Sequence, residues 1–124
     1  MGAGEGIVWY LRTSDEDVGS VRLVVVEGRV SSATAAELSR VLAGRVDGPR
    51  KLVVDLTRVD YVNGAGLRAF ETAAAALNGS GELVVCGLQP PVRVAFDLAG
   101  NIPNLSIAPS RDAALLRLRG QSGL

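Results

Sequence analysis

The apolar residues of this chain follow two different spacings. Short runs rich in valine and leucine are typical of β-strands, and they alternate with stretches in which apolar residues recur every three or four positions, as on one face of a helix. The runs predict strands at Ile7–Leu11, Val21–Val26, Lys51–Leu56, Leu83–Cys86 and Leu105–Ile107. The helical stretches predict helices from Ser31 or Ser32 to 44–48, from the Asn63–Gly66 turn to Leu77, from Pro90 to Gly100 and from Ser110 to about Leu118.

This order, β-β-α-β-α-β-α-β-α, predicts an α/β fold with a mixed, largely parallel sheet of about four or five strands covered by about four helices. The polar residues from Thr13 to Gly19 predict a hairpin turn between the first two strands, and Gly28 is expected to break the second strand. A chain of 124 residues is the size of one domain. We expect residues 1–124 to form it, with a core over about 7–118 and flexible ends at 1–6 and 120–124.

Composition narrows the range of functions. Thirteen basic residues balance 13 acidic ones, which argues against nucleic-acid binding, because that function needs a basic excess. The chain has no histidine, which excludes histidine-dependent catalytic triads and removes the commonest metal ligand. Its single cysteine, Cys86, excludes internal disulfides and cysteine-rich zinc sites. We therefore expect a protein that is not an enzyme and that needs no metal or cofactor.

The ends and the apolar runs give no sign of membrane insertion or export. The glycine-rich N-terminus lacks the basic segment and apolar run of a signal peptide. The apolar runs are also far shorter than the ~20 residues that a membrane-spanning helix needs. These observations predict a cytoplasmic protein that does not contact a membrane.

Two carboxylates and the cysteine are the candidates for acid–base or nucleophilic chemistry. Asp55 and Asp60 lie five positions apart near the end of a predicted strand, but no nucleophile with a neighbouring base accompanies them. We interpret Asp55 as an acceptor for backbone amides in the following turn. Cys86 ends a predicted buried strand, so we interpret it as a small core residue.

The glycine-rich turn Asn63–Gly66 is the place where a ligand could bind, because it joins a strand to a helix N-terminus. The stretch from Gly64 to Ala69 fits the dinucleotide-binding pattern G-x-G-x-x-[GA]. That pattern also requires an acidic residue after the next strand, whereas Glu82 precedes it. We therefore reject dinucleotide binding. The residues alone indicate that the two glycines allow a tight turn and close packing of the helix, and that Asn63 is the helix N-cap.

The same segment resembles the signature of the STAS domains, the anti-sigma factor antagonist family. In that family a buried strand ends in Asp-Leu, Asp-Ser-Ser-Gly or Asp-Ser-Thr-Gly follows, and a leucine begins the helix; Leu52–Leu67 is similar. Glu27–Ala35 resembles the family's Gly-x-Leu-Asp turn and first helix, and Gly81–Leu88 and Val92–Ile102 resemble its later strand and helix. The resemblance covers about Val21 to Leu118.

The resemblance implies a regulator that binds a partner protein, an anti-sigma factor that is also a serine kinase. In the family this kinase phosphorylates the first Ser or Thr of the signature turn, which releases the partner. Here the family's Asp falls on Asn63, the phosphoacceptor on Gly64 and the second hydroxyl on Ala65. Since glycine has no hydroxyl, the usual switch cannot operate at Gly64. A further departure is Ser31, which stands where the family has an Asp.

Several interpretations stay open at this point. The chain is either a constitutively active antagonist or a STAS scaffold for another partner, and a nucleotide- or small-molecule-binding module using the Gly64–Gly66 turn is the alternative. Another hydroxyl, on Ser31, Ser32 or Thr34, is a further candidate phosphoacceptor, although helix capping is the simpler role for these residues. A homodimer is compatible with all of these. The expected partner-binding residues are Ser31, Ser32, Thr34, Asp60, Asn63, Gly64, Ala65, Gly66 and Arg68.

Overall fold

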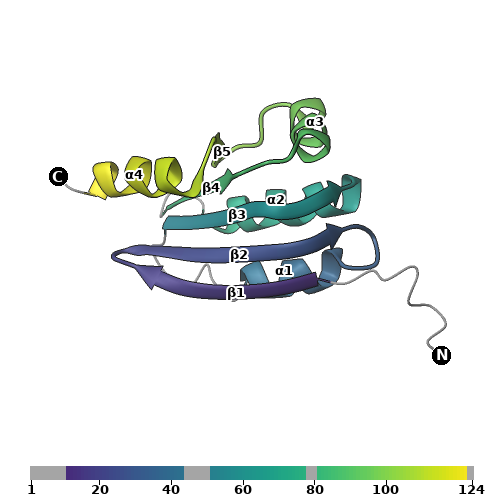
Figure 1. The fold of residues 1–124 in the computed structure, drawn as a ribbon, viewed down its shortest axis with the longest axis horizontal. Coiled ribbons are helices and arrows are strands. Elements are labelled where there is room, and N and C mark those ends of the chain that lie inside the picture. Colours follow the sequence, from purple (N-terminus) through teal and green to yellow (C-terminus); the bar gives the residue numbers. More distant parts are fainter. Residues whose placement is uncertain (1–10, 44–50, 78–80, 123–124) are drawn as a thin grey trace.

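The fold has five strands and four helices in the predicted order. The structure, a computed structural model, describes residues 11–43, 51–77 and 81–122 of the chain, and Figure 1 shows their arrangement. The strands are β1 (Leu11–Val18), β2 (Val21–Val30), β3 (Lys51–Val62), β4 (Glu82–Cys86) and β5 (Leu105–Ala108). The helices are α1 (Ala35–Ala43), α2 (Gly64–Ala76), α3 (Pro90–Ala99) and α4 (Arg111–Ser122).

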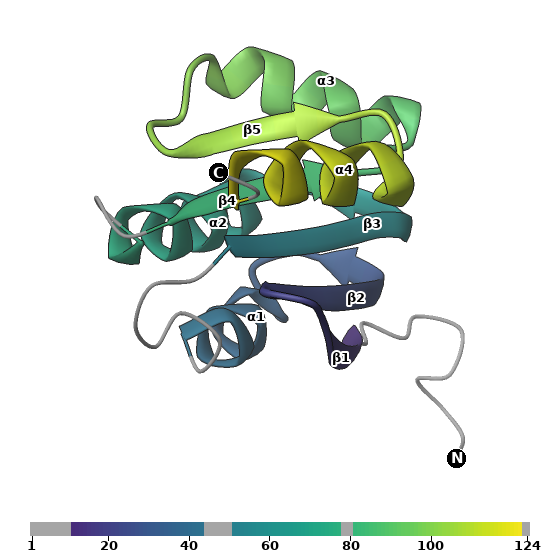
Figure 2. The ribbon, with the colours of Figure 1, turned by 90° about the vertical axis from the view of Figure 1, so that its left-hand side faces the viewer.

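The strands form one mixed sheet in the order β1-β2-β3-β4-β5. Strand β1 pairs antiparallel with β2, and every other pair is parallel. Helices α1, α2 and α3 cover one face, whereas α4 packs on the other face (Figure 2). The predicted α/β class, the element order and the mixed, largely parallel sheet are confirmed.

Two hydrophobic cores lie on the two faces of the sheet. Along β3, Leu52 and Val54 point into the larger core with α1, α2 and α3, while Val53 points into the smaller core with α4. The rings of Phe70 and Phe96, whose centroids are 5.5 Å apart, join α2 to α3. Because both faces are covered, the central strands read as continuous apolar runs instead of alternating ones.

The predicted hairpin between the first two strands is confirmed, but its turn is much shorter than the predicted Thr13–Gly19. Most of these residues form β1, and the hairpin turns through Gly19, which has a φ of +63°. Arg22 on the neighbouring strand pairs with both Asp15 and Asp17, and such cross-strand pairs offset the low strand propensity of aspartate. Of the strand predicted at Ile7–Leu11, residues 7–10 lie outside the described residues, as does the predicted flexible segment 1–6.

Two strands and one helix extend beyond their predicted ends. Gly28 does not end β2 but lies within it, with a φ of +126° where the register to β3 shifts, so this glycine accommodates an irregularity in the strand. Strand β3 continues beyond Leu56 because Val59 and Val62 are again buried. Helix α4 extends beyond Leu118 to Ser122.

Asp55 anchors α4 to the sheet. Its buried carboxylate accepts hydrogen bonds from the backbone N–H of Thr57 at 2.9 Å and from the Thr57 hydroxyl at 2.6 Å. It also pairs with the guanidinium of Arg111, with Nη2 at 2.8 Å from Oδ2. The prediction that Asp55 accepts a backbone amide is confirmed, and Arg111 is a partner that the sequence did not indicate. Neighbouring Cys86 is buried, and burial raises the pKa of its thiol to about 12.

Asp55 should make the stability of the fold depend on pH. Burial alone would raise the pKa of Asp55, but the hydrogen bonds from Thr57 and the contact with Arg111 lower it overall. A lowered pKa in the folded state stabilises the protein above the unfolded carboxyl pKa of about 4, and this contribution is lost as the pH falls through the folded pKa. Asp55→Asn should therefore cost about 1–3 kcal/mol at neutral pH, and its difference from wild type should shrink below about pH 4.

Urea unfolding at a series of pH values measures this difference. Asp60→Asn is the matched control, because Asp60 is an exposed carboxylate on the same strand. An equal effect of the two substitutions at every pH would contradict the anchoring role of Asp55.

Candidate partner-binding site

The candidate site lies where β2 and β3 end side by side. These strands are parallel neighbours, and Val30 pairs with Val62 at their last position. The turn from β2 to α1 and the turn from β3 to α2 therefore leave the same edge of the sheet. All of the expected partner-binding residues lie on these two turns, on the end of β3 or on the first turns of α2.

Asn63 joins the two turns. Its backbone N–H donates to the carbonyl oxygen of Val30 at 3.0 Å. Its side-chain Oδ1 accepts from the N–H of Gly66 at 3.1 Å, which confirms the predicted N-cap. Its Nδ2 is 3.4 Å from the hydroxyl oxygen of Ser32. The sequence did not indicate this last contact, which depends on the parallel register of β2 and β3.

Two of the three candidate hydroxyls, those of Ser31 and Thr34, are buried and form hydrogen bonds within the turn before α1 or with the end of β2. Ser31 is buried and its hydroxyl accepts from the N–H of Ala33 at 3.2 Å. Thr34 is buried as well, and its hydroxyl accepts from the N–H of Ser31 and donates to the carbonyl oxygen of Arg29 at 2.6 Å. These bonds confirm a capping role for the turn before α1. Ser32 is exposed.

The two glycines of the second turn have different surroundings. A Cβ on Gly66 would lie 2.5 Å from Cγ1 of Val30 and 2.9 Å from its carbonyl oxygen. Gly66 is therefore needed for the close approach of α2 to β2. A Cβ on Gly64 would meet nothing within 4 Å, so a side chain would fit there. Gly64 is exposed and Ala65 is partly buried.

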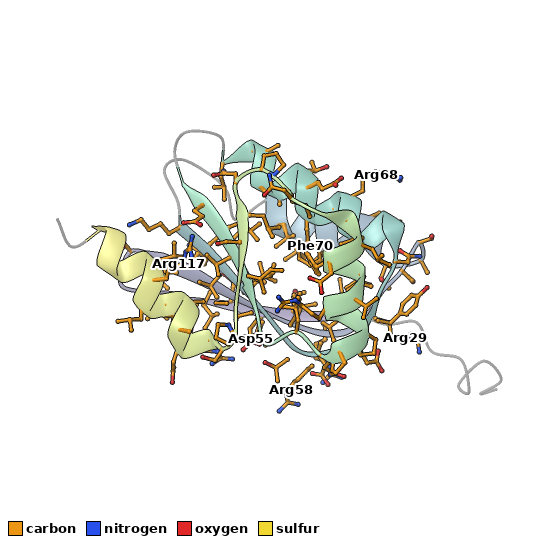
Figure 3. The ribbon with its side chains drawn as sticks, turned by 90° about the horizontal axis from the view of Figure 1, so that it is seen from above. Arg29, Asp55, Arg58, Arg68, Phe70 and Arg117 are labelled. Carbon is orange, nitrogen blue, oxygen red and sulfur yellow. The ribbon has the colours of Figure 1, made fainter. Side chains whose placement is uncertain are left out.

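The remaining candidates lie around the turns. Asp60 is exposed near the end of β3, and Arg68 is exposed on α2. The guanidinium of Arg29 lies over the ring of Tyr61, 4.8 Å from its centroid, a pair that the sequence analysis missed. Figure 3 shows Arg29 and Arg68 toward the same end of the molecule, with Arg117 at the other. Arg29 and Tyr61 are paired positions of β2 and β3, so the strand register would have been needed to find them.

The arrangement offers a surface with donors, acceptors and opposite charges. Residues 11–43, 51–77 and 81–122 contain no group of three His, Cys, Asp or Glu residues able to hold a metal ion. No described helix is long and apolar enough to cross a membrane.

Two cavities, of about 550 and 310 Å³, share the residues Ile102, Pro103 and Asn104, and the Gly64–Gly66 turn lines neither of them. Glu82 is the first residue of β4 and pairs with the first residue of β3, at the opposite edge from the turn, as the rejection of dinucleotide binding required.

Comparisons with known proteins match most of the chain. The model of the STAS domain family matches residues 13–114. A Bordetella bronchiseptica protein, provisionally named anti-sigma factor antagonist BtrV, is 38% identical over 106 residues, which are 84% of this chain and 91% of the relative.

Solved structures have the same fold. An anti-sigma factor antagonist from Mycobacterium paratuberculosis is 28% identical, with a TM-score of 0.82 over 89% of this chain and 95% of its own. The anti-sigma factor antagonist SpoIIAA in its unphosphorylated form is 16% identical, with a TM-score of 0.70 over 88% of this chain and 97% of its own; this second likeness concerns the fold alone.

The contrast between the two glycines can be tested by the same substitution. Gly66→Ala should destabilise the protein by about 1–3 kcal/mol, because the new methyl group would overlap Val30. Gly64→Ala should be neutral or stabilising by up to about 1 kcal/mol, because alanine fits and favours a helix. Urea unfolding of both variants measures the difference, and an equal loss of stability would refute the proposed close approach.

The cap also bears on the chemical stability of Asn63. An asparagine before glycine deamidates when the following N–H can reach its side-chain carbonyl carbon, but here Gly66 and Ser32 hold the amide. Native protein aged at mildly alkaline pH should therefore keep Asn63 intact, whereas urea-unfolded protein should convert it to an acid. Peptide mapping by mass spectrometry measures this and separates Asn63 from Asn78, which also precedes a glycine. Equal conversion in both samples would show that the cap does not hold the side chain.

Proposed function

The chain belongs to the STAS domain family, and we propose that it acts as an anti-sigma factor antagonist-like regulator that binds a partner protein. The proposed partner is an anti-sigma factor of the serine-kinase type, and the proposed contact surface is the pair of turns joined by Asn63. The role is regulatory, not catalytic, and belongs in the cytoplasm. The 38% identity to a relative named as an anti-sigma factor antagonist supports this class of partner.

The observation that carries the proposal is the coupling of the two turns. Asn63 connects α2 to the end of β2 and to Ser32, so the two turns form one surface. Ser32, Asp60, Gly64 and Arg68 are exposed there. A surface of this kind, which carries exposed polar groups and lines neither of the two cavities described above, suits contact with another protein better than binding of a small molecule.

Regulation at the usual position is the point where this chain departs from its family. Gly64 provides no oxygen for a phosphate. We therefore propose that partner binding is constitutive, because phosphorylation at position 64 cannot release the partner. Burial of Ser31 and Thr34 argues against both as alternative acceptors. Of the three candidate hydroxyls, only that of Ser32 is exposed, and phosphorylation there would be incompatible with constitutive binding.

Partner capture by variants of Gly64 tests the proposal. Wild-type protein and Gly64→Ser should both retain a kinase-like anti-sigma factor from a lysate of the source organism. Gly64→Asp should retain at least about tenfold less of this anti-sigma factor, because the aspartate places an uncompensated charge in the interface. Mass spectrometry identifies and quantifies the retained protein. Ser20→Asp is the matched control, since Ser20 is exposed in the hairpin turn at the opposite edge of the sheet.

Adding ATP to the captured complex tests the regulation. Gly64→Ser should gain phosphate at position 64 and release the partner, whereas wild-type protein should stay unmodified and bound. Phosphate on wild-type Ser32 accompanied by release would overturn constitutive binding. Retention of no anti-sigma factor by any variant would overturn the antagonist role and favour a STAS scaffold with a different partner.

A further inference from the structure

Helix α3 is apolar on nearly its whole circumference. Arg93 and Asp97 are its charged residues, and the other eight are proline, valine, alanine, phenylalanine or leucine. Val92 and Phe96 are buried in the larger core. A helix that is apolar all round is normally buried all round. The contacts of α3 with the core bury one side only, so they do not explain why its outer side is apolar as well.

The outer side of α3 carries the most exposed large apolar side chain among the described residues. Leu98 is 84% exposed and Val94, one turn earlier, is 55% exposed. Pro91 is exposed on the same side. Figures 2 and 3 show α3 at the edge of the molecule, with no other drawn element over its outer side. A continuous exposed apolar strip of this kind is typical of a contact surface.

The charges beside the strip indicate what covers it. Arg93 and Asp97 lie one turn apart on a single flank and pair with each other at 3.1 Å. If a second copy of α3 packs antiparallel about a two-fold axis near Ala95, Arg93 of each copy faces Asp97 of the other. The same axis places Leu98 against the second copy between Pro91 and Val94. The strip is therefore complementary to itself in shape and in charge, as a two-fold interface requires.

We propose that α3 is a homodimer interface, formed by antiparallel pairing of α3 with α3 of a second copy. A ten-residue helix is about 15 Å long and about 10 Å across, which is a smaller contact than the ~800 Å² per partner of standard interfaces. The dimer is therefore expected to dissociate in the micromolar range or above. This inference does not rest on the proposed function, because it uses no residue of the two turns.

Sedimentation velocity over a range of protein concentrations tests the proposal. Wild-type protein should associate as its concentration rises, and Leu98→Ser should weaken the association by about tenfold or more. Leu116→Ser is the matched control, because Leu116 on α4 is 73% exposed; it should leave the association unchanged. Circular dichroism confirms that all variants are folded.

Charge reversal separates this pairing from nonspecific association. Arg93→Asp and Asp97→Arg should each be monomeric alone, because like charges then face each other across the axis. Mixed in equal amounts, they should associate, because each copy presents the charges that the other lacks. Both variants lose the pair within the helix, so only pairing between copies explains recovery on mixing.

Each result of these experiments bears on the proposal. Wild-type protein that stays monomeric at every concentration overturns it, as does a Leu98→Ser variant that associates like wild type. Failure of the two charge variants to associate on mixing overturns the antiparallel arrangement. If wild type is monomeric and Leu98→Ser loses the captured anti-sigma factor, the strip belongs to that partner, and the proposed function stands while the homodimer does not.

Discussion

The site depends on the close approach of α2 to the end of β2. That approach is open only to a residue without a side chain, since any Cβ at position 66 would overlap Val30. Because β2 and β3 are parallel neighbours, the same approach brings Asn63 within hydrogen-bond distance of Val30 and Ser32. The two turns are therefore held as a unit by backbone geometry more than by the chemistry of their exposed residues.

The face of the sheet that α4 covers is stabilised by a different set of interactions. Helix α4 buries Ala114 and Leu118 in a small core, and polar contacts supply the rest of its attachment. Arg111 pairs with Asp55, Arg117 with Glu82, and Lys51 donates to the carbonyl oxygen of Leu118. Since Asp55 is buried while Arg111 is half exposed, most of the cost of losing this pair would fall on the unpaired carboxylate.

The sequence predicted the fold better than the details of the site, for physical reasons. Apolar periodicity and glycine turns are local, so the element order and the Asn63 cap could be predicted from them. The acidic stretch Asp15–Asp17 suggested a turn because its stabilising partner, Arg22, lies across the hairpin. The contacts of Asn63 with Ser32 and of Asp55 with Arg111 span 31 and 56 positions, and no local pattern predicts such pairs.

Gly64 and Gly66 lie two positions apart but are constrained differently by the structure. Gly66 is fixed by packing, and Asn63 is fixed by its cap, so both are needed to build the surface. Position 64 has no such constraint, because open space surrounds its missing side chain. A residue there can gain or lose a hydroxyl without disturbing the neighbouring turn. In the proposed function, the surface that binds the partner and the position that would carry a phosphate are therefore constrained separately, because glycine at position 64 leaves the geometry of the two turns intact.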